Sequence, residues 1–326
     1  MELKQQVLKI LEENRGNSVN GARIAEKLFV TRSAVWKAMK ALQKDGYRIN
    51  AVTNKGYCLL PFNDIVSAES ITPFLKGKAS AFVLDVRESV TSTNTVAKEC
   101  ASQGAIEGTV ILAREQTAGK GRMGRTFYSP NSSGIYFTVI LRPKLNLEDS
   151  LLITTATAVA VAKAIEKVSG SKADIKWVND IYVSGKKVCG ILTEASFNIE
   201  NGGLEYAVVG IGINIVTKDF PEDIKSVAGS VFSSKPEGTP VTSILVAEIL
   251  NELADCKDSF SDKRYLEEYR NRSFLLGKEI LVLKKNDAIP AKAVSIDEKA
   301  RLVVEYEDHT SEALSSGEVS VRPRNT

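Results

Sequence analysis

The chain has 326 residues, of which 43% are hydrophobic and 25% charged, so it can form two or three domains with at least one sizeable core. No apolar run approaches membrane-spanning length and residues 1–10 lack the apolar centre of a signal peptide, which predicts a cytoplasmic protein without a membrane partner. A single histidine, His309, and four scattered cysteines exclude multi-histidine metal sites and disulfide frameworks, so we expect no protein metal site.

The first sixty residues are basic, with 11 Lys and Arg against 5 Asp and Glu, whereas the remainder is slightly acidic. Apolar residues recur at helical spacing over residues 3–11, 24–28 and 35–42, and a tight turn at Phe29-Val30 separates the last two segments. Residues 47–52 and 56–60 alternate like a hairpin. The pattern predicts a winged helix-turn-helix, with a small helical cap that has a solvated charged face as the alternative.

In the third predicted helix, Val35, Ala38, Met39 and Leu42 form the buried stripe. The polar and cationic side chains then face outward, and an outward tryptophan is more typical of a contact surface than of a solvated face. Together with a lysine in the hairpin, they give the candidate DNA-binding residues Arg32, Ser33, Trp36, Lys37, Lys40 and Lys55.

The body of the chain alternates between β-branched and helical patterns, with turn residues between them. Helices are expected after Ser92-Thr93-Asn94 and over 149–168, and residues 176–180 are expected to end a strand. Strands are predicted at 81–86, 109–113, 134–141, 187–192 and 206–214, and further short strands at 280–283, 291–296, 302–306 and 319–322. The fold class is therefore α+β, with a mostly antiparallel mixed sheet and a small C-terminal barrel.

A basic, glycine-rich loop with the sequence GKGRMGR lies at residues 119–125. It fits the GxGxxG pattern, but a dinucleotide-binding turn needs a helix directly after the glycines, and the next predicted element is a strand. The Walker spacing is absent, and the chain lacks the HRD and DFG motifs that a kinase loop would require. The loop indicates an anion-binding segment, with a mobile basic surface loop as the alternative.

Several short motifs occur in the order found in biotin protein ligases, and the whole chain resembles the bifunctional bacterial biotin ligase and biotin operon repressor. The motifs are Ser92-Thr93-Asn94, Gln116, the loop 119–125, KWVND at 176–180, Lys187 followed by GIL at 190–192, and GIGIN at 210–214. The resemblance implies a winged helix-turn-helix at residues 1–63, a mixed-sheet catalytic domain at 64–273 and an SH3-like β-barrel at 274–326.

The resemblance implies a reaction in two steps. The carboxylate of biotin attacks the α-phosphate of ATP, which carries Mg²⁺, and gives biotinyl-5′-adenylate and pyrophosphate. A lysine of a carboxylase biotin-carrier domain then attacks the mixed anhydride and releases AMP. The adenylate is also expected to order the basic loop, to promote homodimerisation and to let two helix-turn-helix modules bind operator DNA. Genes of biotin biosynthesis and transport would thereby be repressed.

The residues suit this chemistry, because cations offset the Coulomb repulsion between two anionic reactants. The resemblance implies catalytic roles for Arg122 and Lys187. It implies that biotin is bound by Ser92, Thr93, Asn94, Gln116, Lys120, Gly121, Arg122 and Lys187. It implies that the nucleotide is bound by Arg122, Arg125, Asn179, Asp180, Gly212, Asn214 and Arg322. Glycines at 210 and 212 would let a flat heterocycle approach the strand.

Each motif also has a plainer interpretation. Ser-Thr-Asn is an ordinary helix N-cap, Asn-Asp caps turns, Gly-x-Gly in a strand can be a bulge, and Lys187 can be an exposed hairpin lysine. The chain departs from the family where Lys120 replaces the common Arg and Phe127 the common Trp, and lysine lacks a planar fork, so a looser hold on the adenylate is expected. Rival functions are an inert biotin-sensing repressor, a ligase for a related acid such as lipoate, and a DNA-binding protein with unrelated phosphate chemistry.

Overall fold

The computed structural model describes residues 2–52, 55–61, 63–146, 149–197, 203–256, 260, 263–284 and 287–315, and the backbone of 319–323. The chain divides into two compact units, Met1–Ser80 with Ser234–Glu248, and Ala81–Ser233 with Ile249–Thr326. The predicted domain boundaries after residues 63 and 273 stay predictions. Within the described residues, no helix has the length and apolar character needed to cross a bilayer.

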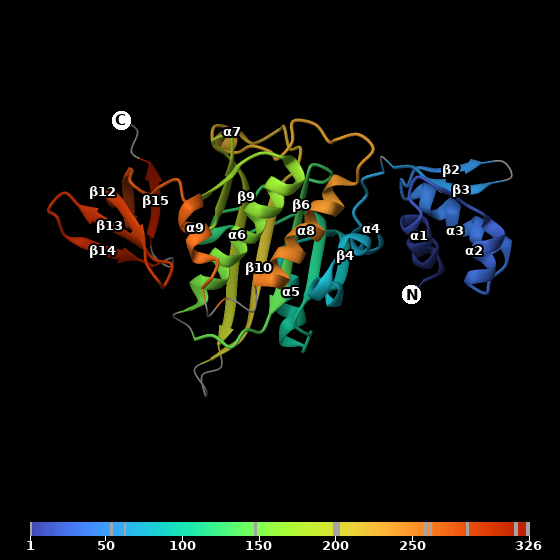
Figure 1. Ribbon diagram of the computed structural model, residues 1–326, viewed down its shortest axis with the longest axis horizontal. Helices are drawn as coiled ribbons and strands as arrows, with labels where there is room; N and C mark the ends of the chain where they lie inside the picture. Colours follow the sequence, from blue (N-terminus) through green and yellow to red (C-terminus); the bar gives the residue numbers. More distant parts are fainter. Residues whose placement is uncertain are drawn as a thin grey trace. The chain divides into compact units, whose positions relative to one another are not determined.

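The N-terminal part of the first unit is a winged helix-turn-helix (Figure 1). Its core is the apolar stripe of the helices, with Leu11, Ile24, Met39 and Leu42 almost fully buried, and Thr31 caps the third helix by accepting a bond from the Ala34 amide. The elements are α1 (Leu3–Glu13), β1 (Ser18–Val19), α2 (Gly21–Lys27), α3 (Arg32–Lys44), β2 (Ile49–Val52) and β3 (Gly56–Leu59), with sheet order β1-β3-β2. Strand β1 was not predicted, because a strand of two residues is too short to show an alternation of polar and apolar side chains.

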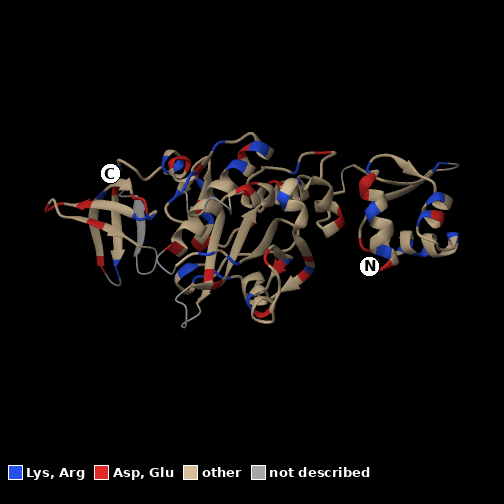
Figure 2. Ribbon diagram, turned by 60° about the horizontal axis from the view of Figure 1, so that its bottom comes forward, with Lys and Arg blue, Asp and Glu red and all other residues tan. Residues whose placement is uncertain are grey.

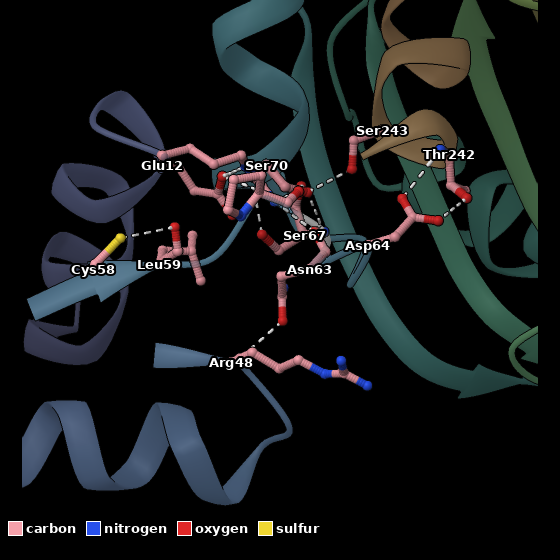
Figure 3. Close-up of polar contacts among 12 residues, drawn as sticks. Glu12, Arg48, Cys58, Leu59, Asn63, Asp64, Ser67, Ser70, Thr242 and Ser243 are labelled. Carbon is pink, nitrogen blue, oxygen red and sulfur yellow. Dashed lines mark hydrogen bonds and ion pairs between the residues drawn. The ribbon is translucent and has the colours of Figure 1, made fainter. Parts of the chain in front are cut away.

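Polar contacts fix the segment that follows the wing (Figure 3). The Asn63 side-chain oxygen accepts the Arg48 amide at 2.9 Å. Asp64 binds the first turn of α8 (Val241–Cys256), where it accepts the amide of Thr242 at 3.1 Å and its hydroxyl at 2.7 Å. In α4 (Ala68–Ile71), Ser70 lies 2.8 Å from the Ser243 hydroxyl. These bonds join residues far apart in sequence within the first unit.

The second unit is built on a seven-stranded sheet in which only β4 and β5 pair in parallel. Its order is β4 (Val83–Val90), β5 (Thr109–Gln116), β6 (Gly134–Leu141), β10 (Leu204–Asn214), β9 (Lys186–Phe197), β8 (Asp180–Val183) and β7 (Ala173–Lys176). Helix α5 (Thr93–Ser102) packs on β5, β6 and β10, and the buried, Ala-rich α6 (Ser150–Ser169) packs on β7, β8 and β9. The α+β class with a mostly antiparallel mixed sheet is confirmed.

Two details of this sheet differ from the sequence-based expectation. The predicted strand end at residues 176–180 is confirmed only for Lys176, the last residue of β7: Trp177, Val178 and Asn179 form the turn to β8, and Lys176 pairs with Asp180 across it. The apolar pair in this turn is buried rather than extended along a strand. The first strand begins at Val83 because Gly77–Ala81 is a 3₁₀ turn.

The C-terminal residues form a small antiparallel β domain within the second unit (Figure 1). Its strands are β11 (Glu279–Lys284), β12 (Asp287–Ile296), β13 (Leu302–Tyr306), β14 (Ser311–Leu314) and β15 (Val319–Pro323), in the order β14-β13-β12-β11-β15. The sequence missed β14 and the helices α8 and α9 (Leu266–Arg272). The indole N–H of Trp177 donates to the Ala300 carbonyl at 3.0 Å, so this domain reaches the β7–β8 turn.

Candidate functional site

A cavity of about 680 Å³ lies in the second unit against strands β9 and β10. Its other walls come from the start of α5, the end of β5, the basic loop, the β7–β8 turn and residues 220–228. The predicted biotin- and nucleotide-binding residues line this one cavity, with the exception of Arg322. They are Ser92, Thr93, Asn94, Gln116, Lys120, Gly121, Arg122, Arg125, Asn179, Asp180, Lys187, Gly212 and Asn214.

Neutral polar side chains form one part of the wall. The Gln116 side-chain oxygen accepts the Thr93 amide at 2.8 Å, and its nitrogen donates to the Ser129 hydroxyl at 2.9 Å. The Asn94 nitrogen donates to the Leu192 carbonyl at 3.1 Å. Ser92 stands at the N-cap of α5, yet its side chain makes no capping bond. The ordinary N-cap interpretation of Ser-Thr-Asn therefore does not describe what these side chains do.

Cationic side chains from different elements meet in the same cavity. Arg122 donates to the Asn179 side-chain oxygen at 3.1 Å, and burial lowers the pKa of this guanidinium, which nevertheless stays charged. Lys120 donates to the Thr95 hydroxyl at 2.9 Å. The Lys187 ammonium lies 2.6 Å from the Asp180 carboxylate, as an ion pair that is about three-quarters shielded from solvent. Lys187 is therefore held in a defined place and is not a free hairpin lysine.

The basic loop folds back on itself and ends on the sheet. The amide of Gly121 donates to the Arg125 carbonyl at 2.7 Å, and the amide of Phe127 donates to the Gly119 carbonyl at 2.9 Å. Arg125 is exposed. No helix opens at these glycines, as the sequence predicted, since only a 3₁₀ turn over Arg122–Gly124 follows.

Protein side chains occupy the space above the strand glycines. Gly190 and Gly212 pair directly across β9 and β10, and a Cβ atom at Gly212 would lie 2.5 Å from the Phe127 ring. A Cβ at Gly210 would lie 2.1 Å from the Asn94 side-chain oxygen. The expected open approach for a heterocycle is thus filled by Phe127 and Asn94. The aromatic ring docks the end of the basic loop on a part of the sheet that has no side chains.

One residue of the cavity wall, Asn214, carries an unused acceptor. The Asn214 side-chain nitrogen donates to the Gly229 carbonyl at 3.0 Å. Its oxygen is buried and has no hydrogen-bond partner among the described residues. Asn179 donates from its side-chain nitrogen to the Ile191 carbonyl at 2.8 Å. Buried acceptors are normally paired, so the Asn214 oxygen marks a place for a ligand donor.

The remaining predicted residues lie elsewhere. Arg322 belongs to β15, where its backbone pairs with Leu281, and its side chain lies outside the described residues. Sequence reasoning missed the wall formed by residues 220–228, including Phe220, which packs against Tyr128 with ring centroids 6.3 Å apart. That segment carries no motif that could have identified it. In the part of the chain that the structure describes, no group of acidic, histidine or cysteine side chains could hold a metal ion.

The candidate DNA-binding residues lie on the winged helix-turn-helix, where Lys and Arg recur along the helices (Figure 2). All of them are exposed, and Trp36 exposes 52% of its surface although it is a large apolar residue. The Lys40 ammonium lies 5.9 Å from the centre of its ring. The Ser33 hydroxyl lies 2.9 Å from that of Thr31. Lys55 is exposed in the turn directly before β3.

Comparison with known proteins gives the family. Residues 86–214 match the biotin/lipoate A/B protein ligase family, residues 4–58 an HTH domain, and residues 275–322 the biotin protein ligase C-terminal domain. The bifunctional ligase/repressor BirA of Bacillus subtilis is 31% identical over 96% of this chain and 97% of its own length, and that of Escherichia coli is 24% identical over 94% of each.

The fold is also similar to solved structures. The biotin protein ligase from Aquifex aeolicus in complex with biotin and ATP superposes with a TM-score of 0.62 and 27% identity, over 74% of this chain and 99% of that one. With its helix-turn-helix, ligase and C-terminal domains in one chain and a relative matched nearly end to end, the protein belongs to the BirA family of bifunctional ligase/repressors.

Proposed function

We propose that the protein joins biotin to ATP in the cavity, transfers the biotinyl group to a lysine of a carboxylase biotin-carrier domain, and represses transcription when it holds the adenylate. The observation that carries the proposal is that one cavity contains neutral hydrogen-bonding residues, converging cations and a buried unpaired acceptor. A ureido ring, two anionic groups and an adenine amino group need these three environments.

In the first step, a carboxylate oxygen of biotin forms a bond to the α-phosphorus of ATP, and the bond to the pyrophosphate oxygen breaks. Arg122 is fixed by Asn179 and can present its planar fork to carboxylate and phosphate oxygens at once. Lys187 would exchange its contact with Asp180 for the charge that grows on the α-phosphate. Arg125 and Lys120 also line the cavity and add positive charge to it. Mg²⁺ is proposed to arrive with the ATP phosphates and to be held by them and by water.

In the second step, the neutral amine of the carrier lysine attacks the acyl carbon, AMP leaves with the electrons of the broken anhydride bond, and the nitrogen releases one proton to solvent as the amide forms. Asn214 would retain the adenine by accepting its amino hydrogen. Ser92, Thr93, Asn94 and Gln116 would retain the biotin end through neutral donors and acceptors. The role of Arg322 stays a prediction.

Specific observations argue against two rival functions. A ligase for lipoate would use the same family fold, but the dithiolane ring of lipoate has no N–H or C=O for the polar wall formed by Thr93 and Gln116. An inert sensor would not need Lys187 and Arg122 aimed into the cavity that holds both substrates. Biotin ligation is therefore the function that the geometry supports best.

For repression, we propose that the adenylate-bound protein dimerises in the cytoplasm and presents two copies of α3 to a two-fold operator. The free state of all four cysteines suits that reducing compartment. The exposed cations on α3 and at Lys55 supply the phosphate contacts. Sedimentation of the protein with and without biotin and ATP tests the dimer, and an unchanged monomer in both samples would refute it.

The decisive experiment is ATP–pyrophosphate exchange with biotin, lipoate or no acid. Lys187→Met should lower the biotin-dependent rate by about 10²–10³, since one preorganised donor is lost. Lys186→Met is a matched control, because Lys186 is the neighbouring residue but its ammonium binds the Ser226 carbonyl outside the cavity, and its rate should stay within about twofold. No exchange with biotin by folded wild-type protein would refute the ligase proposal.

A further inference from the structure

Glu194 is a carboxylate that belongs to none of the sequence motifs and does not line the cavity. It lies on β9 and contacts the biotin-facing end of α5 from outside. One of its oxygens accepts the Asn94 side-chain N–H at 2.9 Å, and the other accepts the Lys98 ammonium at 2.7 Å. Asn94 and Lys98 are one helical turn apart, so they present their side chains on the same face of α5.

These contacts determine which way the Asn94 amide points. An asparagine amide can turn over and exchange its oxygen with its nitrogen. Its nitrogen side here meets the Leu192 carbonyl and the Glu194 carboxylate, both of which only accept hydrogen bonds. A reversed amide would place its oxygen against these two acceptors. The nitrogen is therefore held toward β9, and the oxygen is held over Gly210, where a Cβ atom would lie 2.1 Å away.

The orientation of Asn94 is passed on to the polar wall of the cavity. Thr138, fully buried on β6 and paired with Gly210, places its hydroxyl 2.7 Å from the Asn94 oxygen and 2.8 Å from the Thr93 hydroxyl. With an acceptor at Asn94, the single hydrogen of Thr138 is directed to that oxygen. The Thr93 hydroxyl then has one hydrogen for two acceptors, the Thr138 oxygen at 2.8 Å and the Gln116 oxygen at 3.1 Å.

We infer that Glu194 is a positioning residue, which fixes the Asn94 amide and, through Thr138, the donor–acceptor pattern that the cavity offers to the biotin ring. The inference rests on the proposed function. Burial raises the pKa of Glu194, but the bonds from Lys98 and Asn94 more than offset this, so its pKa lies below the usual 4.5 and the group is charged at neutral pH. Charged, it can only accept a hydrogen bond.

A purely structural role for Glu194 predicts a different result. An ion pair between partly exposed side chains contributes little to stability, and the Glu194 and Lys98 side chains expose 30% and 37% of their surface. If Glu194 only supported the fold, its loss would lower the unfolding temperature and leave the Michaelis constants of both substrates unchanged. If it positions Asn94, the Michaelis constant for biotin changes and that for ATP does not.

The test is Glu194→Gln, because glutamine offers both a donor and an acceptor and therefore permits either orientation of the Asn94 amide. We expect the KM for biotin in ATP–pyrophosphate exchange to rise roughly tenfold, as for one lost hydrogen bond. The turnover number and the KM for ATP should stay within about twofold. Lys98→Met should give a smaller rise in the KM for biotin, since Glu194 then keeps its charge but loses its ion pair with Lys98.

Glu205→Gln is the matched control, since Glu205 is an exposed residue on the neighbouring strand β10 and its carboxylate accepts the Ser196 hydroxyl at 2.9 Å, a distance comparable to that between Glu194 and Asn94. An unchanged biotin KM in Glu194→Gln, or equal changes in Glu194→Gln and Glu205→Gln, would overturn the inference. Wild-type protein is measured first: no biotin-dependent exchange in that sample refutes the proposed function itself. Biotin-dependent exchange by the wild type, together with a wild-type KM for biotin in Glu194→Gln, refutes only the role of Glu194.

Discussion

The ring of Phe127 on the glycine pair of β9 and β10 makes Gly212→Ala the most informative single substitution. A methyl group at Gly212 would come within 2.5, 2.8 and 3.0 Å of three ring carbons. Carbon atoms in contact prefer about 3.5–4.0 Å, so the ring has to retreat by about 1 Å. Phe127 is bonded through its amide to Gly119, and that displacement is therefore passed to the whole basic loop.

We expect Gly212→Ala to lower the rate of biotin-dependent ATP–pyrophosphate exchange about 10²-fold, as a displacement of 1 Å in a positioning element typically does. The effect on stability should be small. Overpacking costs about 1–3 kcal/mol, whereas replacing glycine in a strand returns about 0.5–1 kcal/mol. The assay is the initial exchange rate at saturating biotin and ATP, together with the thermal unfolding midpoint of each variant.

Phe127→Ala supplies the second arm of a double-mutant cycle. It removes the ring, so it should lower the exchange rate by itself, and adding Gly212→Ala should cause no further loss because nothing remains to collide with. Two independent losses that multiply in the double variant would refute this reasoning, as would a Gly212→Ala variant with full activity. Phe127→Trp should retain activity only if the larger ring still fits above both glycines.

Other consequences concern stability and the nucleotide. Arg272 lowers the pKa of Glu166 below the usual 4.5, so this contribution to stability is present above pH 4.5 and is lost as the pH falls through the folded-state pKa. Glu166→Gln should therefore lower the unfolding midpoint at pH 7, and the difference from the wild type should shrink steadily as the pH falls below 4.5. Phe29 has a positive φ of 55° and is 97% exposed, so its backbone is strained and its side chain contributes little burial. Phe29→Gly should therefore raise the free energy of unfolding, measured by urea titration, by up to about 1 kcal/mol. A lower free energy of unfolding would contradict this. Asn214→Ala should raise the KM for ATP about tenfold without changing biotin binding measured by calorimetry.

Elements with strong periodicity could be predicted from the sequence. The apolar stripe of α3 could be predicted because helical spacing persists over many residues, and α6 because it is Ala-rich and is followed by Gly170. Strand β1 has two residues and β14 lacks β-branched side chains, so neither carries a periodic signal. The β7–β8 turn was misassigned because Trp177 and Val178 look like strand residues, although their apolar character reflects burial in the turn.

The candidate site could be predicted in composition but not in its internal contacts. The motif residues converge because the strands that carry them are neighbours in the sheet, which topology alone makes plausible. The docking of Phe127 on Gly190 and Gly212 joins segments more than sixty residues apart, and no local pattern encodes it. The same holds for Glu194, whose partner Asn94 is found 100 residues earlier.

The hydrogen bond between the Trp177 indole and the Ala300 carbonyl connects the C-terminal β domain to a residue of the cavity wall. Trp177 is 4% exposed and lines the cavity, while Ala300 belongs to the small domain more than a hundred residues away. Removing that domain would take away the acceptor of the indole N–H, and such a hydrogen bond contributes about 0.5–1.5 kcal/mol to stability. The smallest functional ligase fragment must therefore keep the C-terminal strands, and a substitution near Ala300 can change substrate binding without contacting either substrate.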